Sequence, residues 1–129
     1  MDKLSDTATS FVPSEDIEIF DSFDTMITDE NILRGIYSYG YERPSQIQQR
    51  AIKPVSLGRD IIGQSQSGTG KTGTFLIGSL QRIDVSTKEP QVLILTPTRE
   101  LANQISDVAT GLSSYMGITI STCVGGKHL

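Results

Sequence analysis

The chain has 129 residues, 36% of them apolar, and a formal net charge of −4, which fits one globular domain at most. No run approaches the ~20 consecutive apolar residues of a membrane span, and the first residues lack a signal-peptide pattern, so we expect an intracellular protein. The single cysteine, Cys123, excludes an internal disulfide, and its apolar-alternating context predicts a small buried residue.

Charge is unevenly divided along the chain. Residues 1–30 carry nine acids and one base, whereas residues 31–129 carry ten bases and six acids. A basic body is compatible with a polyanionic partner, although a solvated acidic tail and an ordinary surface explain the charges equally well. Residues 1–20 are rich in Ser, Thr and acids and are predicted to form a disordered leader, from which Phe20 should dock on the folded part, as should Phe23.

A first helix is predicted after an N-cap at Thr28 or Asp29. Its apolar face comprises Ile32, Leu33, Ile36 and Tyr37. Gly40 is well placed to stop it, because glycine readily adopts the left-handed conformation found at helix ends.

A second helix is predicted from Ser45 to about Lys53. Ser45 and Gln48 have the spacing of a capping box, in which the two side chains satisfy backbone N–H groups at the helix start. Pro54 and a Gly-containing turn at residues 57–60 should then lead into a strand.

The stretch from residue 60 to residue 83 organises the rest of the chain. A short apolar run at residues 61–63 precedes a Gly/Ser-rich loop, and apolar residues at helical spacing follow it. A strand, a glycine loop, a Lys-Thr pair and a helix, in that order, form the context that a phosphate-binding P-loop requires. The predicted loop residues are Ser65, Gln66, Ser67, Gly68, Thr69, Gly70, Lys71 and Thr72.

The residue types in this loop suit the binding of phosphate and Mg²⁺. The glycines at positions 68 and 70 allow successive N–H groups to point into one concave nest, and the following helix dipole adds to its field. Lys71 would reach the outer phosphates, and the Thr72 hydroxyl would ligate Mg²⁺. The strict pattern has glycine where this chain has Ser65, so a Gly/Ser surface turn is the alternative. The flanking strand and helix patterns favour a nucleotide site.

Beyond residue 90 the pattern of strand and helix repeats. Residues 91–96 form a continuous apolar run typical of a buried parallel strand, and residues 118–124 read as a third strand. Between them a helix opens at Pro97-Thr98-Arg99-Glu100, with Leu101, Ile105, Val108 and Leu112 on one face. This alternation predicts right-handed crossovers and a parallel sheet with about three strands, fewer than doubly wound sheets usually have.

Several separated motifs resemble those of the DEAD-box ATP-dependent RNA helicases. The Q motif is resembled by Phe23 together with residues 40–48, and motif I by residues 65–72. Residues 97–102 resemble motif Ia, and Gly125-Gly126 resembles the glycine doublet of the family. The resemblance covers about residues 20–129. Ser65 matches the initiation-factor branch, and residues 33–37 and 47–52 look closest to the translation initiation factor 4A group, with its exon-junction and pre-rRNA-processing relatives.

The resemblance implies an α/β fold in which residues 21–129 form the N-terminal part of a RecA-like P-loop NTPase domain, with an incomplete parallel sheet and flanking helices. It implies RNA-stimulated ATP hydrolysis with Mg²⁺, and local RNA unwinding or clamping. The expected partners are RNA, bound through its sugar-phosphate backbone with low sequence specificity, and proteins of the initiation-factor or exon-junction type. The expected location is the cytoplasm, nucleus or nucleolus.

The resemblance also assigns roles to residues. Gln48 would hydrogen-bond the adenine edge while also capping its helix, Tyr41 would pack on the ring, and Phe23 would close the pocket behind. Arg43 would border the pocket, or be an exposed charge without a role.

For RNA, the resemblance assigns contacts to Pro97, Thr98, Arg99, Gly125 and Gly126. In the alternative interpretation Thr98 only caps a helix, Arg99 pairs with Glu100 or Asp107, and the glycines form a plain turn.

The Asp-Glu-Ala-Asp and Ser-Ala-Thr motifs and the second domain of such helicases do not occur in residues 1–129. We therefore expect this chain alone to bind ATP or ADP weakly without hydrolysing it, and to leave apolar edges uncovered, at a cost in stability. Two alternatives remain open: a truncated non-catalytic nucleotide- or partner-binding module, and another P-loop ATPase or kinase. The second leaves residues 41–48 and 97–102 unexplained.

Overall fold

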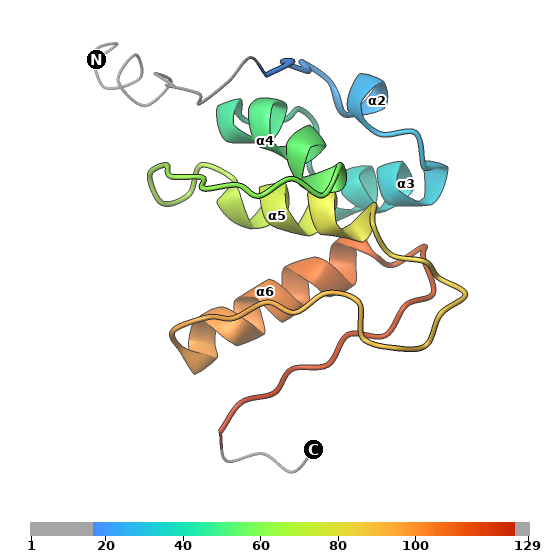
Figure 1. Ribbon diagram of the computed structural model, residues 1–129, viewed down its shortest axis with the longest axis vertical. Coiled ribbons are helices and arrows are strands. Elements are labelled where there is room, and N and C mark those ends of the chain that lie inside the picture. Colours follow the sequence, from blue (N-terminus) through green and yellow to red (C-terminus); the bar gives the residue numbers. More distant parts are fainter. Residues whose placement is uncertain (1–16, 126–129) are drawn as a thin grey trace.

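The computed structural model describes residues 17–125, and the remaining positions of the predicted leader as well as Gly126 lie outside this part. Five helices occur in it: α2 (Phe23–Met26), α3 (Glu30–Tyr39), α4 (Gln46–Ser56), α5 (Lys71–Leu80) and α6 (Arg99–Leu112). Figure 1 shows α4, α5 and α6 one beneath the other, with α2 and α3 beside them. No helix between residues 17 and 125 combines the length and apolarity needed to cross a membrane.

The predicted helix ends are confirmed where a local capping signal specifies them. The Asp29 carboxylate accepts from the N–H groups of Asn31 at 2.8 Å and Ile32 at 3.3 Å, which fixes the start of α3. Gly40 ends that helix in the left-handed region, with φ of 113°. The short helix α2 was not predicted; it has four residues and is capped by the Ser22 hydroxyl.

The predicted end of α4 near Lys53 is wrong, because the helix continues through Pro54 to Ser56. Proline removes one backbone donor, but the last turn of α4 gains tertiary contacts that outweigh this local cost. Val55 packs against Gly78 of α5, where an added Cβ would lie 2.5 Å from the valine Cβ. Arg82 also donates to the Ser56 carbonyl oxygen at 3.3 Å.

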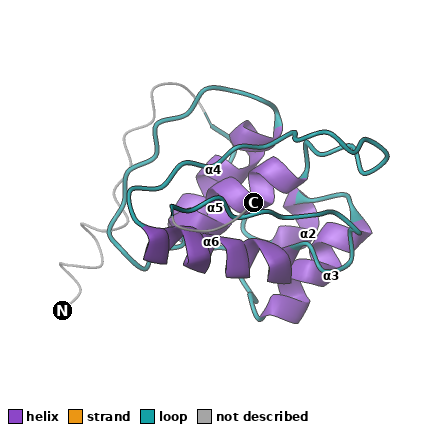
Figure 2. Cartoon of the chain, turned by 90° about the horizontal axis from the view of Figure 1, so that it is seen from below, coloured by secondary structure: helices purple, strands orange, loops and turns teal. Residues whose placement is uncertain are grey.

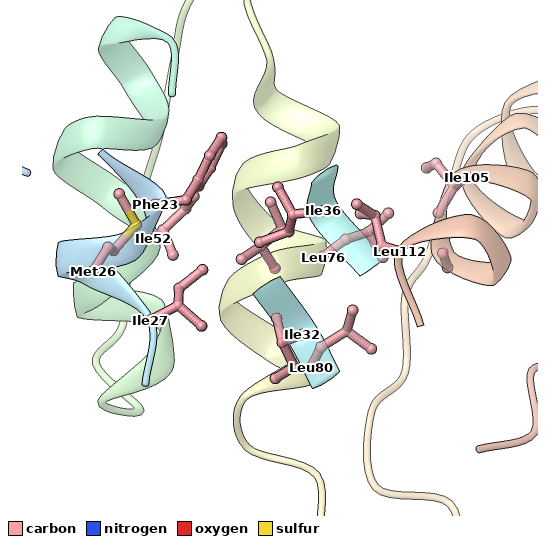
Figure 3. Close-up of a cluster of buried hydrophobic side chains, with 12 residues drawn as sticks. Phe23, Met26, Ile27, Ile32, Ile36, Ile52, Leu76, Leu80, Ile105 and Leu112 are labelled. Atoms are coloured by element: carbon pink, nitrogen blue, oxygen red, sulfur yellow. The ribbon is translucent and has the colours of Figure 1, made fainter. Parts of the chain in front are cut away.

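The hydrophobic core is assembled from all five helices. Its members are Phe23, Met26, Ile27, Ile32, Ile36, Ile52, Leu76, Ile77, Leu80, Ile105, Ala109 and Leu112. Figure 3 shows α5 in the middle of this cluster, with Phe23, Met26 and Ile52 on one side and Ile105 on the other. The prediction that Phe20 docks is confirmed, since its side chain packs on the core and its N–H donates to the Gln49 carbonyl oxygen at 3.1 Å.

The three segments predicted as strands run as loops, and no strand pairing is present between residues 17 and 125 (Figure 2). In the second and third of these segments the side chains nevertheless alternate between exposed and partly buried positions, as in a strand, whereas residues 61–63 are exposed throughout. Ile94 packs on the core, whereas Leu93 is 83% and Leu95 is 84% exposed. A buried parallel strand depends on neighbouring strands and on cover over both faces, and here the helices cover one face only.

The predicted uncovered apolar surface is confirmed by these exposed side chains and by Ile62, which is fully exposed. The prediction that Cys123 is buried is wrong, because the thiol is exposed. Cys123 alternates with the half-buried Thr122 and Val124 and so lies on the outward face of the unpaired segment.

Candidate functional site

The P-loop has the backbone conformation that its glycines predict. Gly68 and Gly70 have φ of 79° and 96°, in the region that side chains disfavour, and Gly70 is the N-cap of α5. Lys71 and Thr72 occupy the first turn of α5, where N–H groups lack partners within the helix. The loop and the positive helix end therefore have the geometry of a helix start that can accept an anion.

Short polar contacts hold this loop closed on itself. The Lys71 ammonium donates to the Ser65 carbonyl oxygen at 2.5 Å, and the Ser65 and Thr69 hydroxyls are 2.7 Å apart. Thr69 also donates to the Gln66 carbonyl oxygen at 2.6 Å. If a phosphate binds here, the Lys71 ammonium would donate to a phosphate oxygen instead of the Ser65 carbonyl oxygen. It would then have a charged hydrogen-bond acceptor in place of a neutral one.

Gln48 joins the start of α4 to the P-loop. Its Oε1 accepts from the Ser45 N–H at 2.9 Å, and its Nε2 donates to the Gly70 carbonyl oxygen at 3.2 Å. The side chain is only 3% exposed. A Cβ at Gly70 or Gly73 would come within 2.8 Å of the Gln48 amide nitrogen, so both glycines make room for it. Ser45 Oγ is buried beside it and has no hydrogen-bond partner within residues 17–125.

An aromatic group lies beside the same corner. Phe23 and Tyr41 are nearly parallel, with ring centroids 6.4 Å apart, and Tyr39 meets Tyr41 nearly edge-on at 5.2 Å. Tyr41 rests against α5, where a Cβ at Gly73 would be 3.1 Å from its hydroxyl oxygen. Burial raises the pKa of Tyr41, and the neighbouring Tyr39 raises it further. Arg43, in the turn that follows Tyr41, is exposed.

A second group of candidate residues lies at the start of α6. The Thr98 hydroxyl accepts from the Leu101 N–H at 3.1 Å, so its capping role is confirmed. Arg99 donates to the Gly125 carbonyl oxygen at 2.6 Å, and within residues 17–125 it forms no ion pair with Glu100 or Asp107. The predicted motif Ia and the first glycine of the doublet are therefore in contact, with the exposed Pro97 next to them.

The structure thus brings the Q-motif turn and the P-loop together and places the Arg99–Gly125 pair separately. No cluster of His, Cys, Asp or Glu suited to a metal ion occurs in residues 17–125. Sequence reasoning missed Gly73 and Tyr39. The tyrosines at positions 37, 39 and 41 and a glycine just after Lys-Thr were the available signals.

Comparison with known proteins gives a consistent result. The model of the DEAD/DEAH box helicase family matches residues 45–129. Eukaryotic initiation factor 4A of Dictyostelium discoideum is 55% identical over 127 residues, which are 98% of this chain and 30% of that relative. The chain therefore spans about a third of the length of this relative.

Solved structures agree with the sequence comparisons. A DEAD box protein from the hyperthermophile Methanococcus jannaschii matches with a TM-score of 0.79 and 32% identity, covering 85% of this chain and 30% of that one. S. cerevisiae Dbp5 bound to RNA and ADP BeF3 matches with a TM-score of 0.73 and 36% identity over the same shares. These likenesses confirm the predicted fold class, the N-terminal part of a RecA-like domain.

Proposed function

Because the chain belongs to the DEAD/DEAH box helicase family, we propose that it carries the ATP-binding site and part of the RNA-binding surface of an ATP-dependent RNA helicase. The observation that carries this proposal is the hydrogen bond between Gln48 and the Gly70 carbonyl oxygen. It unites a turn suited to a base with a loop suited to phosphates, as a nucleotide site requires.

Gln48 keeps enough hydrogen-bonding capacity to read a base. A glutamine amide offers two N–H donors and an oxygen with two lone pairs. The protein uses one donor toward Gly70 and one lone pair toward Ser45. One donor and one acceptor remain for the adenine edge, while Tyr41 and Phe23 supply apolar ring surface and Arg43 borders the pocket.

The P-loop residues take the phosphate roles in this proposal. The N–H groups of residues 65–70 and the start of α5 would cradle the phosphates, and Lys71 would contact the outer ones. Thr72 offers the hard hydroxyl oxygen that Mg²⁺ prefers and would hold the ion together with phosphate oxygens. Bound Mg²⁺ would neutralise phosphate charge during hydrolysis.

RNA would lie along the start of α6. The contact between Arg99 and the Gly125 carbonyl oxygen supports one continuous surface made of residues 97–99 and the glycine doublet. Such a surface addresses the sugar-phosphate backbone and predicts low sequence specificity. One relative provides precedent, because two structures of Dbp5 contain RNA with ADP BeF3 and Gle1 with IP6, respectively. We propose protein partners of the initiation-factor or exon-junction type, and a cytoplasmic or nuclear location.

The complete helicase would hydrolyse ATP, whereas the 129-residue chain by itself would bind nucleotide without hydrolysing it, because the Asp-Glu-Ala-Asp motif is outside its sequence. Calorimetric titration of the chain with ADP and with GDP, both with Mg²⁺, tests the proposed site. We expect heat of binding for ADP and none for GDP. Equal binding of the two would contradict base recognition by Gln48, and Lys71→Ala should abolish the binding of ADP.

A further inference from the structure

Tyr39 lies between the proposed adenine site and helix α6. Its ring meets Tyr41 at 5.2 Å with an interplanar angle of 71°, the arrangement that aromatic pairs favour. On its other side it covers Gly111, where a Cβ would be 2.5 Å from the tyrosine Cδ1 and 3.0 Å from Cε1. The ring therefore occupies the space in which any side chain at position 111 would lie.

Among the residues that the structure describes, the rings of Phe23 and Tyr39 are the ones that contact the Tyr41 ring. Tyr41 also packs against Gly73 of α5. Phe23 is fully buried in the core, and Gly73 is part of the α5 backbone, so both are held in place by the fold. Tyr39 is 42% exposed and is therefore much less enclosed than Phe23. Of the two ring neighbours of Tyr41, Tyr39 is therefore the one that lies outside the core, and it packs against Gly111.

We propose that Tyr39, seated on Gly111, is a positioning residue that holds the Tyr41 ring in the orientation that packs on adenine. This inference rests on the proposed adenine site. Gly111 acts as the seat, since the absence of a side chain there lets the Tyr39 ring approach α6 closely.

The test compares ADP with inorganic pyrophosphate, which has the same two phosphates and no base. Calorimetric titration of the 129-residue chain with Mg²⁺ gives both affinities. An edge-to-face aromatic pair contributes enough that Tyr39→Ala should weaken ADP binding about three- to tenfold. Pyrophosphate affinity should stay within about twofold, because the phosphate loop does not touch Tyr39.

Three variants separate positioning from general loosening of the fold. Tyr39→Phe keeps the ring and should retain ADP affinity. Gly111→Ala should push Tyr39 off its seat and weaken ADP binding, although alanine is the better helix former. Tyr115→Ala is the matched control, because Tyr115 is 44% exposed and contacts Ser38 and Arg34 rather than Tyr41.

The outcomes are distinguishable. Equal loss of ADP and pyrophosphate affinity in Tyr39→Ala, or unchanged ADP affinity in both Tyr39→Ala and Gly111→Ala, would overturn the positioning role and leave the adenine site intact. If circular dichroism shows that Tyr39→Ala unfolds, Gly111→Ala decides. If the unaltered chain binds ADP no better than pyrophosphate, the proposed adenine site fails, and the positioning role with it. In a Tyr41→Ala background, Tyr39→Ala should have no further effect.

Discussion

Gln48 and Gly70 are joined by a 3.2 Å hydrogen bond from the glutamine Nε2 to the glycine carbonyl oxygen. The same oxygen accepts from the Thr74 N–H at 3.0 Å and from the Thr74 hydroxyl at 2.9 Å. These three donors fix the orientation of the last peptide of the P-loop. Gln48 is thus part of the loop's architecture as well as a candidate for base recognition.

Gln48→Ala should therefore destabilise the chain even without nucleotide. The substitution leaves the Ser45 N–H without its side-chain acceptor, and loss of a buried hydrogen-bonding partner costs about 1–3 kcal/mol. Urea denaturation followed by circular dichroism measures the free energy of unfolding. Gln46→Ala, at an exposed position of the same helix, should change it by less than about 0.5 kcal/mol. Equal effects of the two would contradict the bridging role of Gln48.

Close packing of α4 on α5 depends on Gly78. An added Cβ would lie 2.5 Å from both Cβ and Cγ1 of Val55 and 3.2 Å from the Ile52 carbonyl oxygen. Gly78→Ala should lower the free energy of unfolding by about 1–3 kcal/mol through overpacking. Gly125→Ala is the control, because nothing lies within 4 Å of a Cβ there. A neutral Gly78→Ala in urea denaturation would show that the helices separate freely.

A buried and an exposed leucine test whether the helices cover only one face of the apolar segments. Leu112 is fully buried, and Leu112→Ala should cost about 2–5 kcal/mol of unfolding free energy. Leu93 is 83% exposed, so Leu93→Ala should stay within about 0.5 kcal/mol. Leu93→Lys should also raise the solubility of the chain, measured by light scattering, by breaking the exposed apolar surface. A large loss of stability in Leu93→Ala would mean that this segment is covered.

Stability should decline in alkali because of Tyr41. Burial, and then Tyr39, raise the pKa of Tyr41 above the ordinary 10.0, so the folded chain retains a proton that the unfolded chain releases. The free energy of unfolding should be constant below pH 10 and should fall as pH rises toward the folded-state pKa. Urea denaturation between pH 8 and pH 11 measures this. Tyr41→Phe should show a smaller fall, with the remainder including Tyr37, whose pKa burial and Asp24 also raise.

In the complete helicase, Arg99 should contribute to RNA affinity in a salt-dependent way. Arg99→Ala removes a cation from the proposed backbone-binding surface, so the slope of log affinity against log salt should shrink by about one. Fluorescence anisotropy with single-stranded RNA across a salt series measures this. Arg82→Ala should leave the slope unchanged, since Arg82 donates to the end of α4. An unchanged slope in Arg99→Ala would mean that Arg99 only holds Gly125.

Features that depend on residues close together in sequence were predicted correctly, whereas features that depend on contacts between residues far apart in sequence were not. Asp29 and Gly40 mark helix ends through bonds and dihedral angles within a few residues, so the sequence alone sufficed for α3. The continuation of α4 past Pro54 depends on Val55 meeting Gly78, which no local pattern reveals. Whether residues 91–96 pair as a strand likewise depends on segments that are remote in sequence, and so does the packing of Tyr39 against Gly111.

The helical core has a consequence for the order of assembly. The twelve core side chains come from α2 to α6 and the residue that follows α2, and α4 packs on α5, its sequence neighbour. Contacts between consecutive helices close short loops and form early, whereas parallel strands pay a larger closure entropy. The extended segments would then settle onto a helical platform already formed. Substitution of Ile94, which packs on the core, should accordingly leave the folding rate almost untouched and act on unfolding, with a φ-value near zero, while Ile52 and Ile77 should belong to the nucleus.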